Sequence, residues 1–277
     1  MPSFSLAALT ALELAPPALI EVAAACGYDH VGIRLLPAAP GGMAYPLMED
    51  EARLKETIAR LDATGITVAD LEVVAFRPET EIGAFSAFFE AGARLGAKHI
   101  LVAAYDPDLD RFTDRYAGFC DTAAQYGLTA DLEFMPWTYV PDLTTANRIV
   151  AQVGQPNAGV LVDALHFDRS RTSISEITRI PVHRLHYWQL CDGPAERPAT
   201  TNEMMHAARC ERMFPGEGGI DIVSLAHAMP ADITVSIEVP TAELAKTVGA
   251  TDRAQRALNA ARNVIAAAST RPGKGGS

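Results

Sequence analysis

Four oxygen-bearing side chains stand late in four successive apolar segments of the sequence, namely Glu133, Asp163, Gln189 and Glu238. A single acid in such a position is more often an ion-pairing or helix-capping residue than a metal ligand. Three carboxylates gathered in one place would repel one another and raise each other's pKa unless a cation lay between them. Three carboxylates and an amide oxygen form a hard donor set that suits Mn²⁺ or Mg²⁺, with Co²⁺ as a further candidate. We therefore interpret these four residues as ligands of one divalent metal ion.

Further polar residues are candidates for contacts with a substrate. His166 follows Asp163 by three residues and could donate to a substrate oxygen or carry a proton, because its unperturbed pKa lies near neutrality. The alternative is a histidine whose hydrogen bonds are satisfied within the protein. Arg34 and Glu72 lie in neighbouring apolar segments, where they form either a buried ion pair or part of the substrate site.

The long segment 192–219 is predicted to form a lid over the site. Within it, Arg212 and Arg197 are candidates for binding a carboxylate or phosphate group of the substrate, because a guanidinium group can bind either in a bidentate manner. Glu217 in the same segment is expected to hold the loop together. Trp137 is expected to form a wall of the pocket and to shield the site from water.

The elements that must position these residues follow a repeating pattern, in which short β-branched apolar segments alternate with segments of helical period. In 49–64, for example, apolar residues recur at helical spacing, and several such segments end at a glycine, which suits the left-handed conformation that closes a helix. These glycines are Gly27, Gly65, Gly127 and Gly154. Near-continuous apolar strands between helices indicate a parallel sheet covered on both faces. Strands are predicted at 4–8, 30–36, 66–76, 99–106, 128–135, 158–166, 184–191 and 232–239.

Eight such units in 277 residues predict a single (β/α)₈ TIM barrel of the α/β class. An open doubly wound sheet usually has a glycine-rich turn after its first strand, whereas residues 9–17 contain no glycine. We expect one domain, 1–270, followed by a disordered tail, 271–277. Because the carboxyl ends of barrel strands converge on one mouth, the four ligand candidates are expected to be neighbours there.

Composition limits the classes of function. The net charge of −11 argues against general affinity for nucleic acid or for an anionic membrane. The four cysteines show no CxxC spacing, which favours reduced thiols over a disulfide framework or a zinc ribbon. The sequence shows neither a signal-peptide pattern nor an apolar stretch of about 18 residues, so we expect a cytoplasmic protein.

At these residues the sequence resembles the sugar phosphate isomerase/epimerase family, which has a xylose isomerase-like barrel. The family includes ketose 3-epimerases, hydroxypyruvate isomerase, inosose dehydratase and 3-dehydroshikimate dehydratase, with endonuclease IV as a more distant relative. The resemblance extends over most of the chain. Its most specific motifs are Leu132-Glu-Phe-Met-Pro-Trp137, Val162-Asp-Ala-Leu-His166, Trp188-Gln-Leu-Cys-Asp-Gly193, Phe214-Pro-Gly-Glu-Gly-Gly-Ile-Asp221 and Ser236-Ile-Glu-Val-Pro240.

The resemblance implies that the four ligand candidates bind the metal and that His166 contacts the substrate. Most relatives have histidine at the position of Gln189, whereas the hydroxypyruvate isomerases share the glutamine. In the epimerases the first and last glutamates also move protons, which implies a catalytic role for Glu133 and Glu238. The family further implies a manganese enzyme of carbohydrate metabolism that acts on a small molecule and forms a homodimer or homotetramer.

The favoured function is a metal-dependent isomerase or epimerase that acts on a small, sugar-like hydroxy-carbonyl compound through an enediolate. Glu133 and Glu238 would then be the base and the acid on the two faces of the substrate. A dehydratase of a β-hydroxyketone uses the same metal, base and enolate, so it remains an open alternative. Met135 stands where dehydroshikimate dehydratases have a catalytic histidine, and Tyr139 stands where the epimerases have a second glutamate.

Two further classes of function are less compatible with the sequence. A non-catalytic sugar-binding barrel is a minor alternative, although all four ligand positions are filled. Phosphodiester cleavage, as by endonuclease IV, requires a histidine-rich metal cluster and a basic surface, and His166 is the only one of the seven histidines in a matching motif. The net charge of −11 also disfavours this class.

Overall fold

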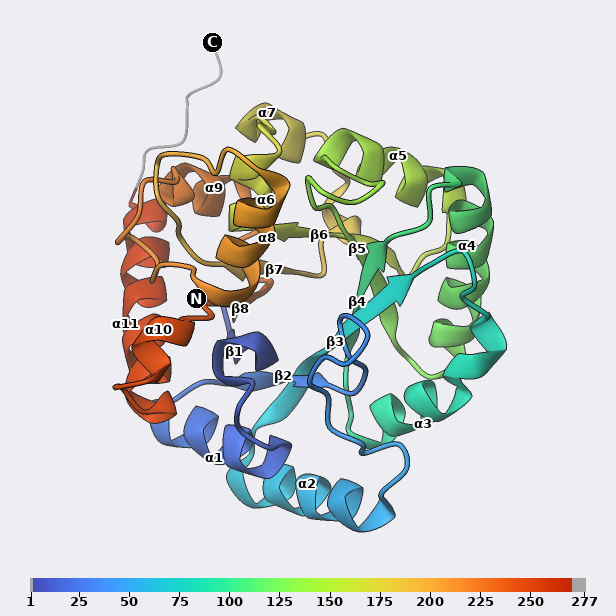
Figure 1. The fold of residues 1–277 in the computed structure, drawn as a ribbon, viewed down its shortest axis with the longest axis horizontal. Coiled ribbons are helices and arrows are strands. Elements are labelled where there is room, and N and C mark those ends of the chain that lie inside the picture. The colour runs from blue at the N-terminus through green and yellow to red at the C-terminus, as the bar shows by residue number, and fades with distance from the viewer. Residues whose placement is uncertain (1, 271–277) are drawn as a thin grey trace.

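The computed structural model describes residues 2–270, in which eight parallel strands close into a barrel in the order β1 to β8 (Figure 1). Helices surround the barrel, which confirms the predicted (β/α)₈ fold. The predicted tail, 271–277, lies outside the described residues. The strands are β1 (Phe4–Leu6), β2 (His30–Arg34), β3 (Thr67–Phe76), β4 (His99–Ala104), β5 (Thr129–Glu133), β6 (Ala158–Asp163), β7 (Tyr187–Leu190) and β8 (Thr234–Ile237).

Helices connect successive strands and separate the barrel from solvent. The α-helices are α1 (Pro16–Cys26), α2 (Glu51–Thr64), α3 (Ser86–Arg94), α4 (Leu109–Gln125), α5 (Leu143–Val153), α6 (Ala164–Arg169), α7 (Ile174–Ile177), α8 (Thr201–Cys210), α9 (Ile222–Ala228), α10 (Ala242–Ala245) and α11 (Ala250–Ser269). The short 3₁₀-helices are η1 (Ala8–Ala11), η2 (Ile82–Phe85) and η3 (Val182–Arg184).

All eight predicted strands are present, although most end earlier than predicted. The largest error at the carboxyl end of a strand concerns the sixth strand, predicted at 158–166, because β6 ends at Asp163. The Asp163 carboxylate accepts a hydrogen bond from the His166 backbone N–H at 3.0 Å and so caps α6. His166 therefore lies in the first turns of a helix and not on a strand.

The helix predictions hold in outline. The helix predicted at 49–64 is α2, which begins at Glu51 because the Asp50 side chain caps it. The glycines predicted to end helices do so, and Gly27 and Gly154, with φ of 83° and 69°, directly follow α1 and α5.

Each strand presents one face to the helices and the other to the inside of the barrel. The outward-facing Ile33, Val102 and Trp188 belong to the main hydrophobic core. The inside is more polar, and its fully buried side chains include Ser5, Asp70, Asp131, Gln189 and Ser236. This polar interior is the reason why acidic residues interrupt otherwise apolar strands.

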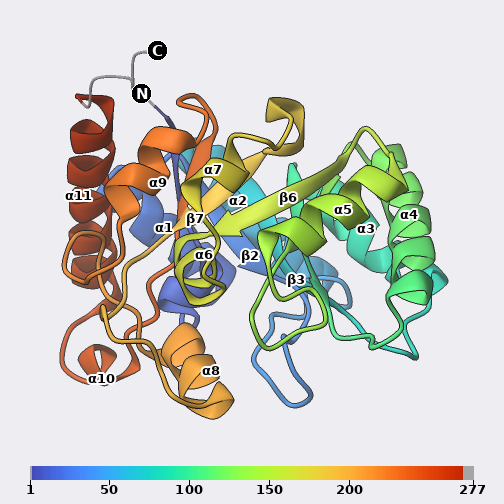
Figure 2. The same ribbon diagram turned by 90° about the horizontal axis from the view of Figure 1, so that it is seen from above.

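The segment 192–219, predicted as a lid loop, contains the helix α8. The α8 helix and the segment that follows β2 extend from the same end of the barrel (Figure 2). The buried Asp192 organises the rest of the segment, because its carboxylate accepts backbone N–H groups of Gly193, Gly216, Gly218 and Ile220 at 2.8–3.1 Å. The segment is thus built around an internal carboxylate.

The alanine-rich stretch 241–268 forms α10 and most of α11, and α11 packs on α1 and α9 of its own barrel. None of the helices within residues 2–270 combines the length and hydropathy of a membrane span. The four cysteines are free thiols.

Candidate metal centre

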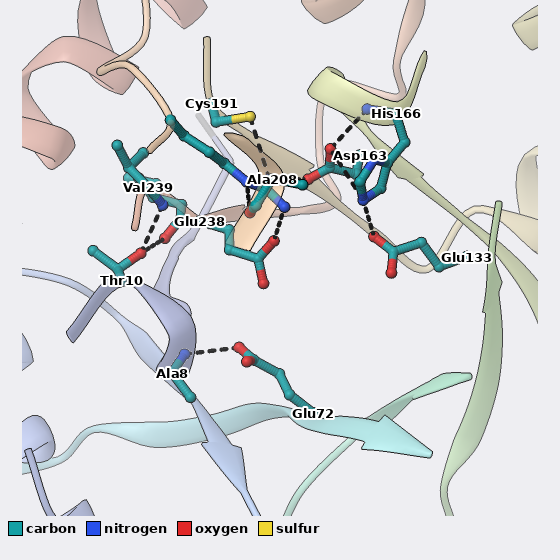
Figure 3. Close-up of polar contacts among 12 residues, drawn as sticks. Ala8, Thr10, Glu72, Glu133, Asp163, His166, Cys191, Ala208, Glu238 and Val239 are labelled. Atoms are coloured by element: carbon teal, nitrogen blue, oxygen red, sulfur yellow. Dashed lines mark hydrogen bonds and ion pairs between the residues drawn. The ribbon is translucent and has the colours of Figure 1, made fainter. Parts of the chain in front are cut away.

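The residues predicted to bind metal lie together where strands β5 to β8 end. Glu133 and Asp163 are the last residues of β5 and β6, Gln189 lies in β7, and Glu238 directly follows β8. In the sheet register Gln189 is the partner of Asp163, so both side chains point to the same side. Figure 3 shows Glu133, Asp163 and Glu238 facing a common space, with Glu72 of β3 across from them.

Glu133, Asp163 and His166 form the tightest group. One potential ligand atom of each lies within 4.8 Å of those of the other two. His166 Nε2 is 3.6 Å from Glu133 Oε1 and 4.0 Å from Asp163 Oδ1. Metal–donor distances are about 2.0–2.6 Å, so two donors of one ion are separated by at most about twice that length. The three side chains are therefore close enough to share one ion.

A buried arginine joins two acids of the site. Arg212 Nη1 donates to Asp163 Oδ2 at 2.5 Å, its Nη2 is 2.7 Å from Glu238 Oε2, and its Nε donates to the Ala208 carbonyl at 2.8 Å. The sequence makes Arg212 of the lid segment a candidate for binding a substrate anion. In the structure Arg212 lines the pocket and is also paired with Asp163 and Glu238, because two carboxylates buried side by side require a nearby cation.

Gln189 is fully buried, and neither atom of its side-chain amide has a hydrogen-bond partner within residues 2–270. Buried amide groups are nearly always hydrogen-bonded, because an unmet group loses its hydration without compensation. An amide oxygen beside Asp163 and close to further carboxylates is a suitable donor for a divalent cation. The residues present thus fit a divalent metal ion.

The acids of the site differ in their tendency to hold a proton. Burial and the charges of Asp163 and Glu238 raise the pKa of Glu133 well above its usual value. Burial also raises the pKa of Glu238 to about 7, although Arg212 opposes this effect. Burial acts in the same direction on Asp163, but Arg212 and His166 outweigh it and the pKa is lowered. Burial lowers the pKa of His166 to about 4, so its imidazole is neutral at neutral pH.

Of the remaining predicted site residues, some line the pocket and others do not. Arg34 and Glu72 form a buried ion pair of 2.6 Å, and Arg34 also lines the pocket above the acids. Trp137 lines the same pocket, with its ring edge-on to His166 at a centroid distance of 5.0 Å. Arg197 lies outside the pocket lining, in an ion pair with Asp168 at 3.1 Å.

The pocket over these residues has a volume of about 250 Å³. Glu133, His166, Arg212 and Glu238 line it. Ligand sites for drug-sized molecules usually measure about 300–1,000 Å³, so this pocket has room only for a small molecule.

Sequence reasoning missed two acids. Asp192 holds the segment 192–220 together by accepting hydrogen bonds from its backbone N–H groups. The sequence pattern that could have indicated this role is an acid next to a glycine after a predicted strand, followed later by a glycine-rich turn. Asp70 is fully buried inside the barrel, and neither carboxyl oxygen has a partner in the described part of the chain. Burial and the charge of Glu72 raise its pKa well above the usual value. The sequence pattern that could have indicated Asp70 is its spacing of two residues from Glu72, which places both side chains on the same face of the strand.

A second group of potential ligands, His99, Asp131 and His186, lies near the amino ends of the strands. Here both carboxylate oxygens have partners, because Asp131 Oδ1 is 2.6 Å from His186 Nδ1 and Oδ2 accepts from Thr129 Oγ1 at 2.6 Å. This group is satisfied by its own hydrogen bonds, whereas the group around Gln189 is not. We therefore assign the candidate metal centre to the carboxyl ends.

The fold and the site together define a parallel (β/α)₈ barrel with a carboxylate-rich centre at the carboxyl ends of its strands. Residues 20–264 match the sequence model of the xylose isomerase-like TIM barrel family, and the chain belongs to this family. This confirms the resemblance inferred from the motifs. No curated protein matches the chain by sequence.

Solved structures with the same fold cover nearly the whole chain. An IolI protein with a bound zinc atom has a TM-score of 0.80 and 22% identity, over 95% of this chain and 98% of that one. An L-ribulose 3-epimerase has a TM-score of 0.71 and 14% identity, over 97% and 96%. The probable 3-DHS dehydratase AsbF from Bacillus anthracis has a TM-score of 0.72 and 12% identity, over 94% and 99%. At these identities the likeness shows the fold.

Proposed function

We propose that the chain is a divalent-metal-dependent isomerase or epimerase that moves a proton within a small hydroxy-carbonyl compound. The observation that carries this proposal is the group of Glu133, Asp163 and His166, whose ligand atoms lie within 4.8 Å of one another. The Gln189 amide beside them gives support, because it has no hydrogen-bond partner within residues 2–270 and offers a further oxygen donor. Relatives of the same fold include an L-ribulose 3-epimerase and a D-allulose 3-epimerase, and another is solved with zinc.

The ion would be held by Glu133, Asp163 and Gln189, with His166 close enough to be a further donor. Glu238, whose carboxylate pairs with Arg212, faces the same space and is proposed as the fourth oxygen ligand. When bound, it would stabilise negative charge that develops on substrate oxygens. The oxygen donors favour Mn²⁺ or Mg²⁺, and a neutral imidazole nearby also admits Co²⁺ and Zn²⁺.

The proton transfers would fall to the two glutamates. Glu133 and Glu238 come from β5 and β8 and line the same pocket, so both can reach one small molecule. Burial raises the pKa of Glu238 when no ion is bound, and buried carboxyl groups of this kind can act as general acids and bases. His166, neutral at that pH, can donate from one ring nitrogen to a substrate oxygen. Trp137 would shield these groups from water.

The test is proton exchange with solvent by metal-reconstituted protein in deuterium oxide, followed by NMR for ketoses, hydroxypyruvate and cyclic β-hydroxyketones. Exchange without loss of water supports an isomerase or epimerase. A new enone absorbance would instead indicate the dehydratase, and metal-dependent binding without exchange would indicate a sugar-binding barrel. Removal of the metal with a chelator should abolish exchange.

Variants separate the roles of the residues. Glu133→Gln and Glu238→Gln should each lower the exchange rate by at least about 100-fold, the usual size of a general acid or base contribution. Gln189→Ala should weaken metal binding by at least about tenfold, measured by calorimetry. Glu217→Gln is the matched control, because Glu217 is exposed and pairs with Arg256 away from the pocket. If both glutamine variants at 133 and 238 keep the full rate, the two-glutamate mechanism is wrong.

A further inference from the structure

The pocket is polar at its base and mostly apolar around its walls. Glu133, His166, Arg212 and Glu238 supply the polar groups of the base. The walls come from several elements that are far apart in the sequence. Their apolar side chains include Leu9, Leu12, Val73, Leu101, Met135 and Trp137.

The two halves of the barrel mouth also differ. The ends of β5 to β8 carry the four ligand candidates, whereas β3 and β4 contribute Val73 and Leu101 to the pocket. Leu101 belongs to a separate apolar cluster inside the barrel, with Leu161 and Tyr187, and Val73 packs against this cluster. A substrate bound to the acids by one end therefore meets Val73 and Leu101 with its other end, and Arg34 is the charged side chain that lines the pocket on this side.

The walls carry few polar side chains, and most of these can only donate hydrogen bonds. Besides the four base residues, the polar side chains that line the pocket are Arg34, Tyr105, Trp137 and Arg209. Arginine and the indole N–H are donors only, so the wall side chains that can accept a hydrogen bond are Tyr105 and, weakly, the thioethers of Met43 and Met135. The Trp137 Nε1 atom is buried and has no partner within residues 2–270.

These walls suit some oxygen groups and not others. A hydroxyl group on each carbon of a sugar chain needs an acceptor for its proton, and burial without a partner weakens binding. An isolated carbonyl, ether or carboxylate oxygen needs only donors, which Arg34, Trp137 and Arg209 provide. Contact between the remaining wall area and a hydrocarbon group of the substrate adds favourable binding free energy, because apolar surface is removed from water.

We propose that the substrate carries its reacting hydroxyketone on an apolar body, a hydrocarbon ring or chain with at most isolated acceptor oxygens, and that the pocket disfavours open-chain polyols. This inference rests on the proposed function, because it takes the acids at the base as the place where the hydroxyketone reacts. It assigns a specificity role to the β3–β4 side of the mouth, chiefly to Val73 and Leu101, and to Met135 after β5.

The experiment compares 2-hydroxycyclohexanone with L-ribulose on manganese-loaded protein. Calorimetry measures binding, and deuterium exchange measures turnover. The cyclic ketone is expected to bind at least about tenfold more tightly, because an apolar pocket discriminates against an added hydroxyl by up to about 100-fold. Equal or tighter binding of L-ribulose overturns the inference, and so does a lack of measurable binding by the cyclic ketone.

The two readouts keep this inference and the proposed function apart. Exchange with L-ribulose alone would refute the apolar substrate and leave the proposed function intact. Absence of exchange with every compound would refute the proposed function, while the ratio of binding constants would still decide the substrate class.

Near-isosteric variants locate the source of the preference. Val73→Thr and Met135→Gln add hydrogen-bonding groups to the wall with little change in volume, and each should shift the binding ratio toward L-ribulose by about tenfold. Val182→Thr is the matched control, because Val182 is 67% exposed and lies outside the pocket lining. Circular dichroism and metal content verify that each variant is folded and loaded. An unchanged ratio in both wall variants would refute the assigned role of these residues.

Discussion

At the scale of single residues, the charge balance of the site depends on Arg212. Its guanidinium group contacts Asp163 and Glu238, at 2.5 and 2.7 Å, and all three side chains are buried. Two anions in such a place are stable only while a cation lies within contact distance. A divalent ion bound to the same acids would share this role with the arginine.

Arg212→Met therefore tests the coupling between stability and metal binding. With chelator present, we expect the variant to lose about 3–5 kcal/mol of unfolding free energy, because two buried carboxylates lose their partner. Saturating Mn²⁺ should raise the unfolding free energy of the variant by more than that of the wild type. For the wild type the expected increase is about 2.7 kcal/mol at an Mn²⁺ concentration of 100 times the dissociation constant. Urea denaturation with and without metal measures both effects. Arg197→Met, an exposed control, should change little, and an equal loss in both media would refute the coupling.

The sequence allowed the main residues of this site to be predicted, because carboxylates late in apolar strands are costly unless they have a function. Glu133, Asp163, Gln189 and Glu238 do lie at one end of the barrel. The contacts of Arg212 could not be predicted, because they depend on the path of the segment 192–219. That path is set by Asp192 and its hydrogen bonds to backbone groups up to 28 positions away.

At the scale of elements, the β6–α6 junction is a place where the hydrophobic periodicity of the sequence does not distinguish a strand from a helix. Asp163 both ends β6 and caps α6, and the residues that follow it are largely buried on either interpretation. A short apolar segment is compatible with strand and helix alike, so the predicted strand ran on to His166. The glycines were a clearer signal, because a positive φ excludes most other residues.

The backbone conformation predicts opposite effects on the unfolding free energy for two glycine-to-alanine substitutions. Gly154 closes α5 with a φ of 69°, so Gly154→Ala should cost about 1–2 kcal/mol of unfolding free energy although no atom lies within 4 Å of the added methyl group. Gly118 lies inside α4 with equally open surroundings, so Gly118→Ala should add about 0.5–1 kcal/mol. Thermal and urea denaturation measure both. A similar sign in the two variants would contradict the conformational argument.

The loop from β4 to α4 is held by the Asp106 carboxylate, to which Arg111 donates through Nε at 2.8 Å and Nη2 at 2.5 Å. These hydrogen bonds lower the pKa of Asp106. A carboxyl group with a lowered folded pKa stabilises the fold above its unfolded value of about 3.9 and loses this contribution as the pH falls through the folded value.

Asp106→Asn should therefore be less stable than the wild type above about pH 5, and the difference should shrink below about pH 4. We expect a difference of about 1 kcal/mol, because solvent screens the partly exposed Arg111 side chain. Urea denaturation at a series of pH values measures it. A difference that stays constant down to pH 2 would show that the charge of Asp106 does not contribute.

At the scale of the whole molecule, the fold depends on joining its two ends. The first and last strands pair in parallel, with Ser5 beside Ser236, and this pairing closes the barrel. The alternation of strands and helices was sufficient to predict eight units, and barrel closure then followed from their number. The predicted homodimer or homotetramer, the cytoplasmic location and the single domain stay predictions, of which light scattering tests the first.

Arg253 of α11 fastens the last helix to the start of the chain. Its guanidinium group donates to the Thr10 carbonyl at 3.0 Å and pairs with Glu13, and its side chain is 3% exposed. Arg253→Met leaves these groups without their partner, so it should cost about 2–3 kcal/mol. Because closure makes both ends part of one cooperative unit, tryptophan fluorescence and circular dichroism should report one shared transition in wild type and variant. Asn263→Met, at an exposed position of the same helix, should change stability by less than about 0.5 kcal/mol. Separate transitions for the two probes in the variant would show that α11 unfolds independently of the barrel.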